Sequence, residues 1–571
     1  MSFEAPVREQ RFVLDHVARI ADLAANARFA AASEDVVDAV LEGAGAFATG
    51  VWAPLNRIGD TEGARWTPEG VRMPKGFIDG YRDYVDGGWG TIGVPEDFDG
   101  QGLPFVIQTA VLDTLGTANM SFALCPILTA GAIEALVHHG SADQQALYLP
   151  HLATGAWTGT MNLTEPQAGS DVGALRATAT PRGDGTFAIK GTKIFISYGD
   201  HDLAANIVHL VLARTPGAPE GTRGISLFLV PKYRLDAEGT PDTFNDVNVT
   251  SIEHKMGLHA SPTCVLSFGD RDDCIGELIG PECGGMRAMF TMMNNARLNV
   301  GLQGVQIAER ATQAAVGYAL ERVQSPRAGT ASKAPVRIID HPDVRRMLLR
   351  MKAQTQAARA LVYYAAAQVD RAALGDAAAQ HRLELLTPLA KAHATDLGNE
   401  VASLGIQVHG GMGYVEETGA AQHFRDARIT PIYEGTNGIQ AADLVGRKLG
   451  LAQGAAFAAL IADMRADARH PELIALIEAV EVAGYRLTGA SADDRLAASY
   501  PFLTMLSVAV CGWLMERAGQ VALPDDDFAK MKRACVGFYL DQILPEAIGL
   551  RVAAMTGADP LYKLDAEAFA V

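Results

Sequence analysis

The spacing of hydrophobic residues divides the chain into a helical part, a strand-rich part and a second, longer helical part. Through residues 1–155 apolar residues recur at helical spacing, as in Asp35–Leu41, and alanine is frequent. From Trp157 to Phe268 short apolar and β-branched runs alternate with turn residues, a pattern typical of β-strands. The pattern therefore predicts a β domain after an N-terminal helical region.

Helical periodicity returns after the β region. We expect helices over residues 286–322, 341–373, 381–404 and 440–449, which would form an α-helical bundle with antiparallel neighbours. A further helical segment runs from about Ala455 to the end, and four prolines are expected to separate its helices: Pro471, Pro501, Pro524 and Pro545.

This order of segments predicts an α+β multidomain fold. It has an N-terminal α-helical domain, a central β-barrel-like domain, a C-terminal four-helix-bundle domain and an additional C-terminal helical domain. We place an N-terminal helical extension at residues 1–40 and the domains at residues 41–155, 156–278, 279–450 and 451–571.

Composition and charge narrow the possible partners. The 571 residues include 48 Lys and Arg against 66 Asp and Glu, a formal charge of −18, which disfavours nucleic acid and anionic lipid. The start, Met1–Glu4, lacks the apolar core of a signal peptide. The apolar run Leu503–Met515 is shorter than the roughly 20 residues that cross a bilayer. We expect a soluble, cytoplasmic protein without a membrane span.

Two patterns that often mark cofactor sites carry no such meaning in this chain. The six cysteines form no C-x-x-C pair, so we expect neither a disulfide framework nor a metal site. Gly88–Gly93 matches the G-x-G-x-x-G dinucleotide fingerprint, but Pro95 and a loop follow in place of a helix. A structural glycine-rich loop is the better interpretation.

Three other segments are more informative together than apart. Alone, Met161–Asp171 can be a Pro/Gly turn, Gln407–Tyr414 a helix end, and Arg425–Asn437 a solvated loop. In this order around a β domain, and with Lys255–Gly257, they resemble the acyl-CoA dehydrogenase family over residues 40–450. The extended C-terminus and His259–Cys264 resemble its large bacterial branch, which includes 3-methylmercaptopropionyl-CoA and long-chain acyl-CoA dehydrogenases.

The resemblance implies oxidation of an acyl-CoA to a 2-enoyl-CoA. In this family a carboxylate removes the α-proton while the β-hydride passes to N5 of FAD. Glu434, within Ile432–Thr436, matches the catalytic base. Some relatives place this glutamate directly before the arginine matched by Arg297, but this chain has Ala296 there, which strengthens the assignment of Glu434.

The same resemblance implies the residues that bind cofactor and substrate. Those expected to bind FAD are Met161, Leu163, Thr164, Ser170, Phe195, Ile196, Ser197, Arg322, Gln407, Gly410, Gly411, Gly435 and Thr436. Those expected to bind the acyl-CoA are Ser170, Asn294 and Arg297. Arg322 and the Gln407–Gly411 segment match residues that bind the FAD of a neighbouring subunit, so we expect a homo-oligomer. The C-terminal extension favours a homodimer.

Two departures from the family pattern affect the cofactor site. Ser325–Asp340 is longer than in relatives and contains Arg327, Lys333 and Arg337, so it is either a basic approach for an anionic CoA or nucleotide or a solvated loop. Gly438 stands where a polar residue often completes the adenine site.

The sequence therefore predicts an FAD-dependent acyl-CoA dehydrogenase of fatty acid β-oxidation that passes electrons to an electron-transfer flavoprotein. An acyl-CoA oxidase, which uses O₂ as acceptor, has the same base and flavin and is the first alternative. A non-catalytic helical scaffold is the second, although such a protein would be expected to lack Glu434. Substrates from 3-(methylthio)propanoyl-CoA to long-chain acyl-CoA remain open.

Overall fold

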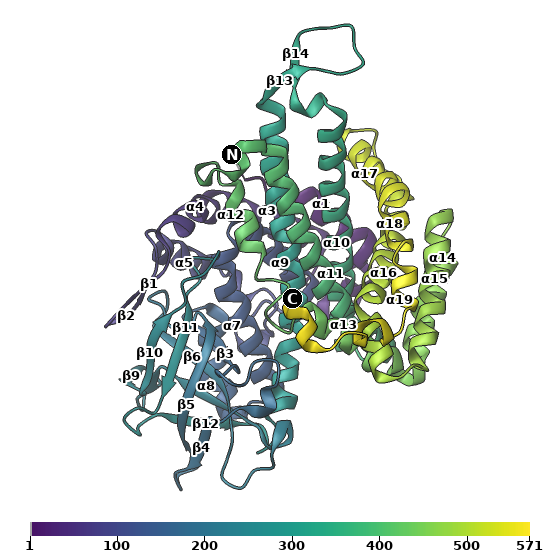
Figure 1. Ribbon diagram of the computed structural model, residues 1–571. Helices are drawn as coiled ribbons and strands as arrows, with labels where there is room; N and C mark the ends of the chain where they lie inside the picture. The colour runs from purple at the N-terminus through teal and green to yellow at the C-terminus, as the bar shows by residue number, and fades with distance from the viewer. Residues whose placement is uncertain (1–2) are drawn as a thin grey trace. The chain divides into compact units, whose positions relative to one another are not determined.

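The computed structural model describes residues 3–571, except for the side chains of Met292 and Asn294. It separates into two compact units, one of residues 35–296 and the other of the residues up to Glu34 together with Arg297–Val571. Each unit is described by itself below, and Figure 1 gives the element labels.

Unit 35–296 combines helices with a β-sheet. Its helices are α3 (Glu34–Phe47), α4 (Ala53–Glu62), α5 (Phe77–Asp86), α6 (Phe105–Ala118), α7 (Met120–His139) and α8 (Ala142–Thr154). A capping box of Ser141 and Gln144 begins α8, and α7 begins where the side chain of Asn119 accepts the N–H of Phe122. Between α5 and α6 the glycine-rich segment forms only short 3₁₀ turns, so no helix follows Gly88–Gly93.

The main sheet of this unit has eight strands. They are β3 (Trp157–Asn162), β4 (Thr178–Pro181), β5 (Phe187–Ser197), β6 (Asn206–Ala213), β7 (Ser226–Pro231), β10 (Val247–Ile252), β11 (Thr263–Phe268) and β12 (Ile275–Ile279). Strands follow the order β10-β11-β5-β12-β7-β6-β3, with β4 paired to β5; β3 and β6 are parallel and the other pairs antiparallel. Two small hairpins are β1 (Arg65–Thr67) with β2 (Gly70–Arg72), and β8 (Tyr233–Leu235) with β9 (Pro241–Phe244).

The second unit is almost entirely helical. Its helices are α1 (Val7–Val13), α2 (Ile20–Ala24), α9 (Gly285–Glu321), α10 (Pro342–Ala373), α11 (Ala377–His409), α12 (Ala420–Ala427), α13 (Asn437–Gly446), α14 (Ala455–Asp467), α15 (Pro471–Thr488), α16 (Ala492–Gly519), α17 (Asp527–Phe538), α18 (Leu544–Ile548) and α19 (Arg551–Met555). Of α9, the residues from Arg297 onward belong to this unit and the earlier ones to unit 35–296. Helices α10 and α11 pack against each other, and α16 packs against α10, α11 and α13. The C-terminal extension is thus in contact with the bundle.

Helix caps explain where two bundle helices begin. The side chain of Asp376 accepts the N–H groups of Ala378 and Ala379, so α11 begins at Ala377, four residues before the start that apolar spacing indicates. The hydroxyl of Thr436 accepts the N–H of Ile439, and α13 accordingly begins at Asn437 rather than Gln440.

The expectation that four prolines separate the C-terminal helices is wrong for Pro501. Pro471 lies in the first turn of α15, Pro545 in the first turn of α18, and Pro524 between α16 and α17, but Pro501 lies inside α16. A proline within a helix removes one hydrogen bond, and here the burial of the neighbouring apolar side chains along α16 outweighs that loss.

The segment after α9 forms a short hairpin. Strands β13 (Val323–Pro326) and β14 (Pro335–Arg337) pair, with Val323 opposite Arg337. Arg327, Lys333 and Arg337 are exposed, and Arg337 lies 3.8 Å from Asp340. The basic approach for an anionic ligand stays a prediction.

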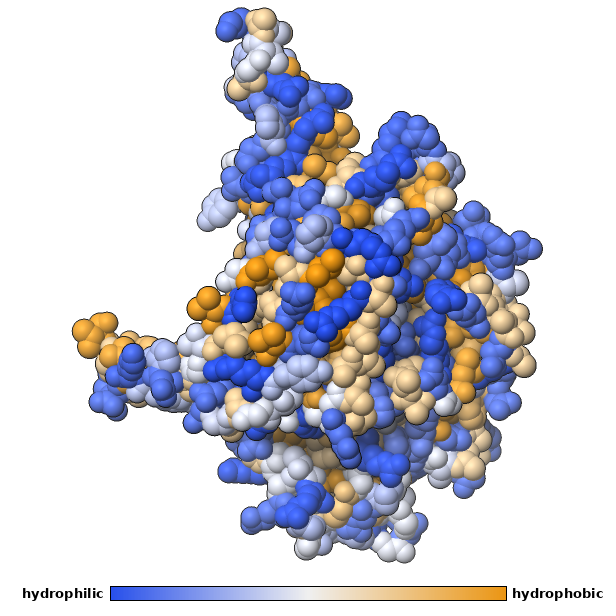
Figure 2. All heavy atoms as spheres, turned by 90° about the vertical axis from the view of Figure 1, so that its right-hand side faces the viewer, coloured by the Kyte–Doolittle hydropathy of each residue, from blue (hydrophilic) through white to orange (hydrophobic). Residues whose placement is uncertain are grey.

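Four helical stretches are long and apolar enough to cross a membrane by length and composition. They are Glu34–Glu62, Met120–His139, Asn437–Asp467 and Ala492–Gly519, with 33%, 83%, 39% and 83% of their most apolar windows buried within the protein. The last stretch, Ala492–Gly519, contains the apolar run Leu503–Met515. That run is therefore only part of a longer helix. Figure 2, which faces the C-terminal helices, shows hydrophobic side chains interspersed with hydrophilic ones.

Candidate functional site

The structure brings the expected flavin segments of unit 35–296 side by side. Leu163 and Thr164 follow β3 directly, and the N–H of Ile194 on β5 donates to the carbonyl of Thr164 at 2.9 Å. Because Phe195–Ser197 completes β5, the two segments that the sequence assigns to FAD meet at one place.

A buried ion pair fastens these two segments together. The Nζ of Lys193 lies 2.8 Å from Oε1 of Glu165 and 3.1 Å from the carbonyl oxygen of Leu163, and both charged side chains are almost fully buried. Glu165 also accepts the N–H groups of Arg176 and Ala177 at 2.7 and 3.0 Å. Burial alone would raise the pKa of Glu165, yet the ammonium and these N–H groups outweigh it and hold the pKa below its usual value.

Phe195 presents an apolar surface beside this junction. Its side chain is 59% exposed and its φ is +59°, a backbone conformation that non-glycine residues adopt only where the surrounding structure imposes it. Ile196 and Met161 are buried, Ser197 is half-buried, and Ser170 is exposed. An exposed aromatic ring at the edge of a polar backbone segment suits contact with the flat ring of a flavin.

Glu434 lies in a tight loop of the second unit between α12 and α13. The N–H of Asn437 donates to the carbonyl of Pro431 at 2.9 Å, and the hydroxyl of Tyr433 donates to Oε1 of Gln303 on α9. Glu434 itself has a φ of +55°. The loop therefore holds a non-glycine residue in the left-handed region, a strain typical of functional positions.

Electrostatics around Glu434 fit a proton acceptor. Burial raises the pKa of its carboxyl above the usual value, and Arg297 on α9 and Lys391 on α11 oppose that shift without cancelling it. Arg297 is 7% exposed and its Nε has no hydrogen-bond partner within the part of the chain that the structure describes. A carboxylate with a raised pKa between two cations can remove a proton from a weak carbon acid.

Lys391 is a buried cation that the sequence motifs did not reveal. It is fully buried, and its Nζ donates to Oδ1 of Asn437 at 2.9 Å. Burial lowers the pKa of Lys391 to about 7, although Glu434 and Asp396 act in the opposite direction. A lone lysine among the apolar residues Leu389–Ala392 was the only sequence signal for it.

Gly435 and Thr436 directly follow the base in the chain. Gly435 has a φ of +84°, and a Cβ there would lie 2.7 Å from Nε2 of Gln440 and 3.7 Å from a terminal nitrogen of Arg297. Thr436 caps α13. Gly435 and Thr436 thus share one small region with Glu434 and Arg297.

The other expected cofactor residues lie at a different end of the bundle. Arg322 directly follows α9, and Gln407, Gly410 and Gly411 lie at the end of α11; the rings of Tyr318 and His409 stack at 4.5 Å and join these two helix ends. Arg297 and Arg322 are separated by 25 positions, about 37 Å along a helix at 1.5 Å per residue. The two groups therefore lie far apart along the bundle of a single chain.

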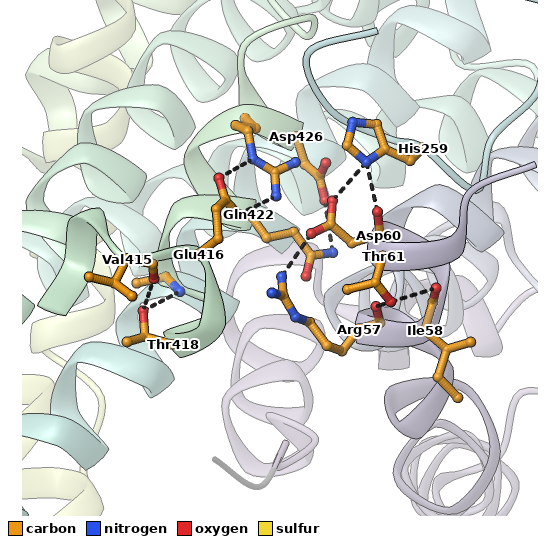
Figure 3. Close-up of polar contacts among 12 residues, drawn as sticks. Arg57, Ile58, Asp60, Thr61, His259, Val415, Glu416, Thr418, Gln422 and Asp426 are labelled. Carbon is orange, nitrogen blue, oxygen red and sulfur yellow. Dashed lines mark hydrogen bonds and ion pairs between the residues drawn. The ribbon is translucent and has the colours of Figure 1, made fainter. Parts of the chain in front are cut away.

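Polar contacts order two further motif segments, one in each unit (Figure 3). In unit 35–296, Nδ1 of His259 lies 2.8 Å from the carbonyl oxygen of Asp60 on α4 and 3.2 Å from its carboxylate, which also pairs with Arg57. In the other unit, Glu416 pairs with Arg425 at 2.8 Å just after the Gln407–Tyr414 segment. These contacts stabilise the loops and place no reactive group.

The side chain of Asn294 lies outside the described residues, so its predicted contact with substrate stays a prediction. Ala296 lies beside Arg297 on α9 and is buried. Within residues 3–571, no three His, Cys, Asp or Glu side chains are grouped closely enough to hold a metal ion.

Domain comparisons cover most of the chain. Residues 39–156, 160–271 and 284–449 match the N-terminal, middle and C-terminal domains of acyl-CoA dehydrogenase, and residues 453–565 match a domain described as acetyl-CoA dehydrogenase C-terminal like. The last match coincides with the helices that extend beyond the bundle.

Full-length relatives agree with these matches. The chain is 45% identical to 3-methylmercaptopropionyl-CoA dehydrogenase of Ruegeria pomeroyi, over 96% of this chain and 97% of that protein. It is 36% identical to a butyryl-CoA dehydrogenase of Syntrophomonas wolfei, over 94% of each. The fold resembles an acyl-CoA dehydrogenase of Bacillus anthracis solved with FAD, with a TM-score of 0.74 at 21% identity over 92% of this chain and 88% of that one.

Proposed function

This chain belongs to the acyl-CoA dehydrogenase family of FAD-dependent oxidoreductases, and on that premise we propose that it converts a short acyl-CoA to its 2-enoyl-CoA with Glu434 as the base. The observation that carries the proposal is the carboxylate of Glu434, which is held in a strained loop and has a raised pKa between Arg297 and Lys391.

The base needs both its raised pKa and its neighbouring cations. The α-proton of a thioester is weakly acidic, so an acceptor with an ordinary carboxyl pKa would hold the removed proton poorly. Arg297 and Lys391 keep part of the Glu434 population ionised and ready to accept. Ala296, next to Arg297, has no group that could take the proton instead.

The residues beside β3 and β5 fit FAD. The exposed ring of Phe195 offers an apolar face, and Leu163, Thr164 and Ser197 offer polar backbone and hydroxyl groups around it. FAD, when bound, supplies the acceptor for the β-hydride, which no side chain can provide. The Lys193–Glu165 pair holds the two segments in register for that binding.

We propose 3-(methylthio)propanoyl-CoA as the first substrate to test and butyryl-CoA as the second. The two full-length relatives named above carry these substrates, or close variants of them, in their names, and both align over more than nine-tenths of the chain. We propose Ser170, Asn294 and Arg297 as the residues that bind the CoA ester.

We further propose that the active protein is a homodimer with FAD sites shared between chains. The distance of about 37 Å along α9 between Arg297 and Arg322 supports this arrangement, because Arg322, Gln407, Gly410 and Gly411 would then bind the partner's FAD. We propose an electron-transfer flavoprotein as electron acceptor, a role in acyl-CoA β-oxidation, and a cytoplasmic location without a membrane span.

Anaerobic mixing of the FAD-loaded protein with a panel of acyl-CoA esters tests the proposal. We expect the oxidised-flavin absorbance to bleach fastest with 3-(methylthio)propanoyl-CoA or butyryl-CoA and more slowly with long chains. Bleaching by long chains alone would contradict the proposed substrate. Rapid reoxidation of the reduced protein in air with release of peroxide would favour the oxidase alternative.

A further inference from the structure

The C-terminal extension touches the polar residues behind the base through one tyrosine. Tyr500 on α16 donates its hydroxyl to Oδ2 of Asp396 on α11 at 2.6 Å. Asp396 is half-buried, and Tyr500 is 38% exposed. The hydrogen bond therefore links the extension, which none of the family's cofactor or substrate motifs covers, to the bundle helix that carries Lys391.

From Asp396 the contacts continue to the base loop through Asn437. The amide nitrogen of Asn437 donates to Oδ1 of Asp396 at 2.8 Å and to the carbonyl of Ala392 at 3.1 Å. These two acceptors fix the direction of the amide, so that its oxygen faces Nζ of Lys391 at 2.9 Å. Asn437 is three residues from Glu434, and its own N–H closes the loop onto Pro431.

Asp396 is the charged acceptor of this amide, beside the carbonyl of Ala392 and the hydroxyl of Thr395, which accepts it at 3.0 Å. A protonated Asp396 is a weaker acceptor for the amide nitrogen of Asn437 than the carboxylate is, so protonation loosens the hold on the amide whose oxygen accepts from Lys391. The hydroxyl of Tyr500 favours the ionised form of Asp396, against the effect of burial, which raises the pKa of that carboxyl.

Several charged groups surround this path. Arg297 and Lys391 act on Glu434, and Asp396 acts on Lys391 in turn. Arg297 also acts on Lys391, and Arg428 acts on Asp396. The other charged neighbours of Arg297 are Asp443 and Arg447. Tyr433 lies next to Glu434 and is bonded to Gln303. Arg297 is buried on α9 and acts electrostatically on both Glu434 and Lys391.

We propose that Tyr500 is a positioning residue of the C-terminal extension, which fixes Asp396 and Asn437 and thereby holds Lys391 against the loop that carries Glu434. The inference rests on Glu434 being the base. It assigns the extension a part in the reaction in addition to packing against the bundle.

The direction of the effect follows from the charges. Without the Tyr500 hydroxyl, Asp396 is ionised less and supports the ammonium form of Lys391 less. A less charged Lys391 lowers the pKa of Glu434 less, so the pKa of Glu434 rises. Flavin reduction, which needs ionised Glu434, then declines at a higher pH than in the unaltered protein.

The test compares Tyr500→Phe with Tyr485→Phe, a half-exposed tyrosine of neighbouring α15. The rate of anaerobic flavin reduction by acyl-CoA is measured against pH, with saturating FAD and substrate. We expect Tyr500→Phe to move the acid midpoint upward by roughly half a pH unit, and Asp396→Asn and Lys391→Met to move it by about one unit. Tyr485→Phe should leave it in place.

A second measurement follows Glu434 without turnover. The infrared difference between each protein and its Glu434→Gln counterpart isolates the protonated carboxyl of Glu434, whose titration should move upward in step with the kinetic midpoint. Thermal unfolding and FAD content of Tyr500→Phe should remain close to those of Tyr485→Phe. If Tyr500→Phe does not fold, the Asp396→Asn titration decides.

Two outcomes overturn the inference. One is an unchanged acid midpoint in Tyr500→Phe and Asp396→Asn. The other is weakened FAD binding in Tyr500→Phe together with an acid midpoint that is unchanged at saturating FAD. Tyr500 lines a pocket of about 490 Å³ with Thr436 and Gly438. That second outcome would mean that Tyr500 contacts the adenine part of FAD and does not position Lys391. Failure of the proposed function is distinct, because Glu434→Gln would then still reduce flavin at near-normal rate.

Discussion

The buried pair of Lys193 and Glu165 offers a test of how the flavin segments are held. The perturbation is Lys193→Met, which keeps the length and apolar stem of the side chain and removes its ammonium. Glu165 would then keep the N–H groups of Arg176 and Ala177 and the amide of Gln167 but lose its only cationic partner among the described residues.

The structure sets the size of the expected effect. Because Lys193 is 0% and Glu165 4% exposed as side chains, solvent cannot replace the lost ammonium. Leaving one buried charge without its partner costs about 3–5 kcal/mol. For a unit of this size each kcal/mol lowers the unfolding temperature by roughly 2–4 °C, so the midpoint should fall by about 10 °C.

Calorimetric unfolding and FAD titration measure the result. The matched control is Lys190→Met on the same strand, whose exposed ion pair with Asp272 should contribute no measurable change. The double variant Lys193→Met with Glu165→Gln should recover much of the loss, because no buried charge remains. Equal, small effects of Lys193→Met and Lys190→Met would refute the reasoning.

Three further predictions concern the base loop and the flavin surface. Gly435→Ala places a Cβ 2.7 Å from Nε2 of buried Gln440 at a φ of +84°. It should slow flavin reduction on the order of 10²-fold, as expected for a base displaced by about 1 Å. Gly446→Ala at the open end of α13 is the control, and equal rates of flavin reduction in both variants would contradict this prediction. Phe195→Ala should weaken FAD binding roughly tenfold, as measured by equilibrium titration, with no loss of thermal stability because the ring is 59% exposed. The control Ile78→Ala should change neither FAD affinity nor thermal stability. An unchanged FAD affinity in Phe195→Ala would remove Phe195 from the flavin site. The rate of flavin reduction should fall as pH drops through a midpoint above 4.5, the ordinary pKa of a glutamate side chain. The reason is that burial raises the pKa of Glu434 and only its ionised form accepts a proton. A midpoint at or below 4.5 would contradict the raised pKa.

Local sequence signals were sufficient for much of the fold. Apolar spacing placed the bundle helices within a few residues, and the family motifs indicated the order of domains that the domain matches show. The starts of α11 and α13 shifted because Asp376 and Thr436 cap them, an effect that depends on side-chain geometry rather than on apolar spacing. Pro501 was misinterpreted because tertiary burial of α16 overrides the helix-breaking tendency of a single proline.

The candidate site was only partly predictable for a similar reason. Glu434 and Gly435 lie in a contiguous motif, so the sequence alone indicates them. Lys391 and Asp396 lie on one helix, and Tyr500 lies on another about a hundred positions later. Lys391 and Asp396 bond Asn437, and Tyr500 bonds Asp396, only in the folded chain. No local pattern distinguishes a buried lysine that faces a carboxylate from one at the surface.

The central claim is that Glu434 removes the α-proton, and substitution by its isosteric amide tests it most directly. Glu434→Gln and the control Glu417→Gln, an exposed glutamate of a nearby turn, are loaded with FAD and mixed anaerobically with 3-(methylthio)propanoyl-CoA and butyryl-CoA. The account predicts that Glu434→Gln binds FAD normally but reduces it ~10³-fold or more slowly, while Glu417→Gln matches the unaltered protein. A near-normal rate of flavin reduction in Glu434→Gln would contradict the account.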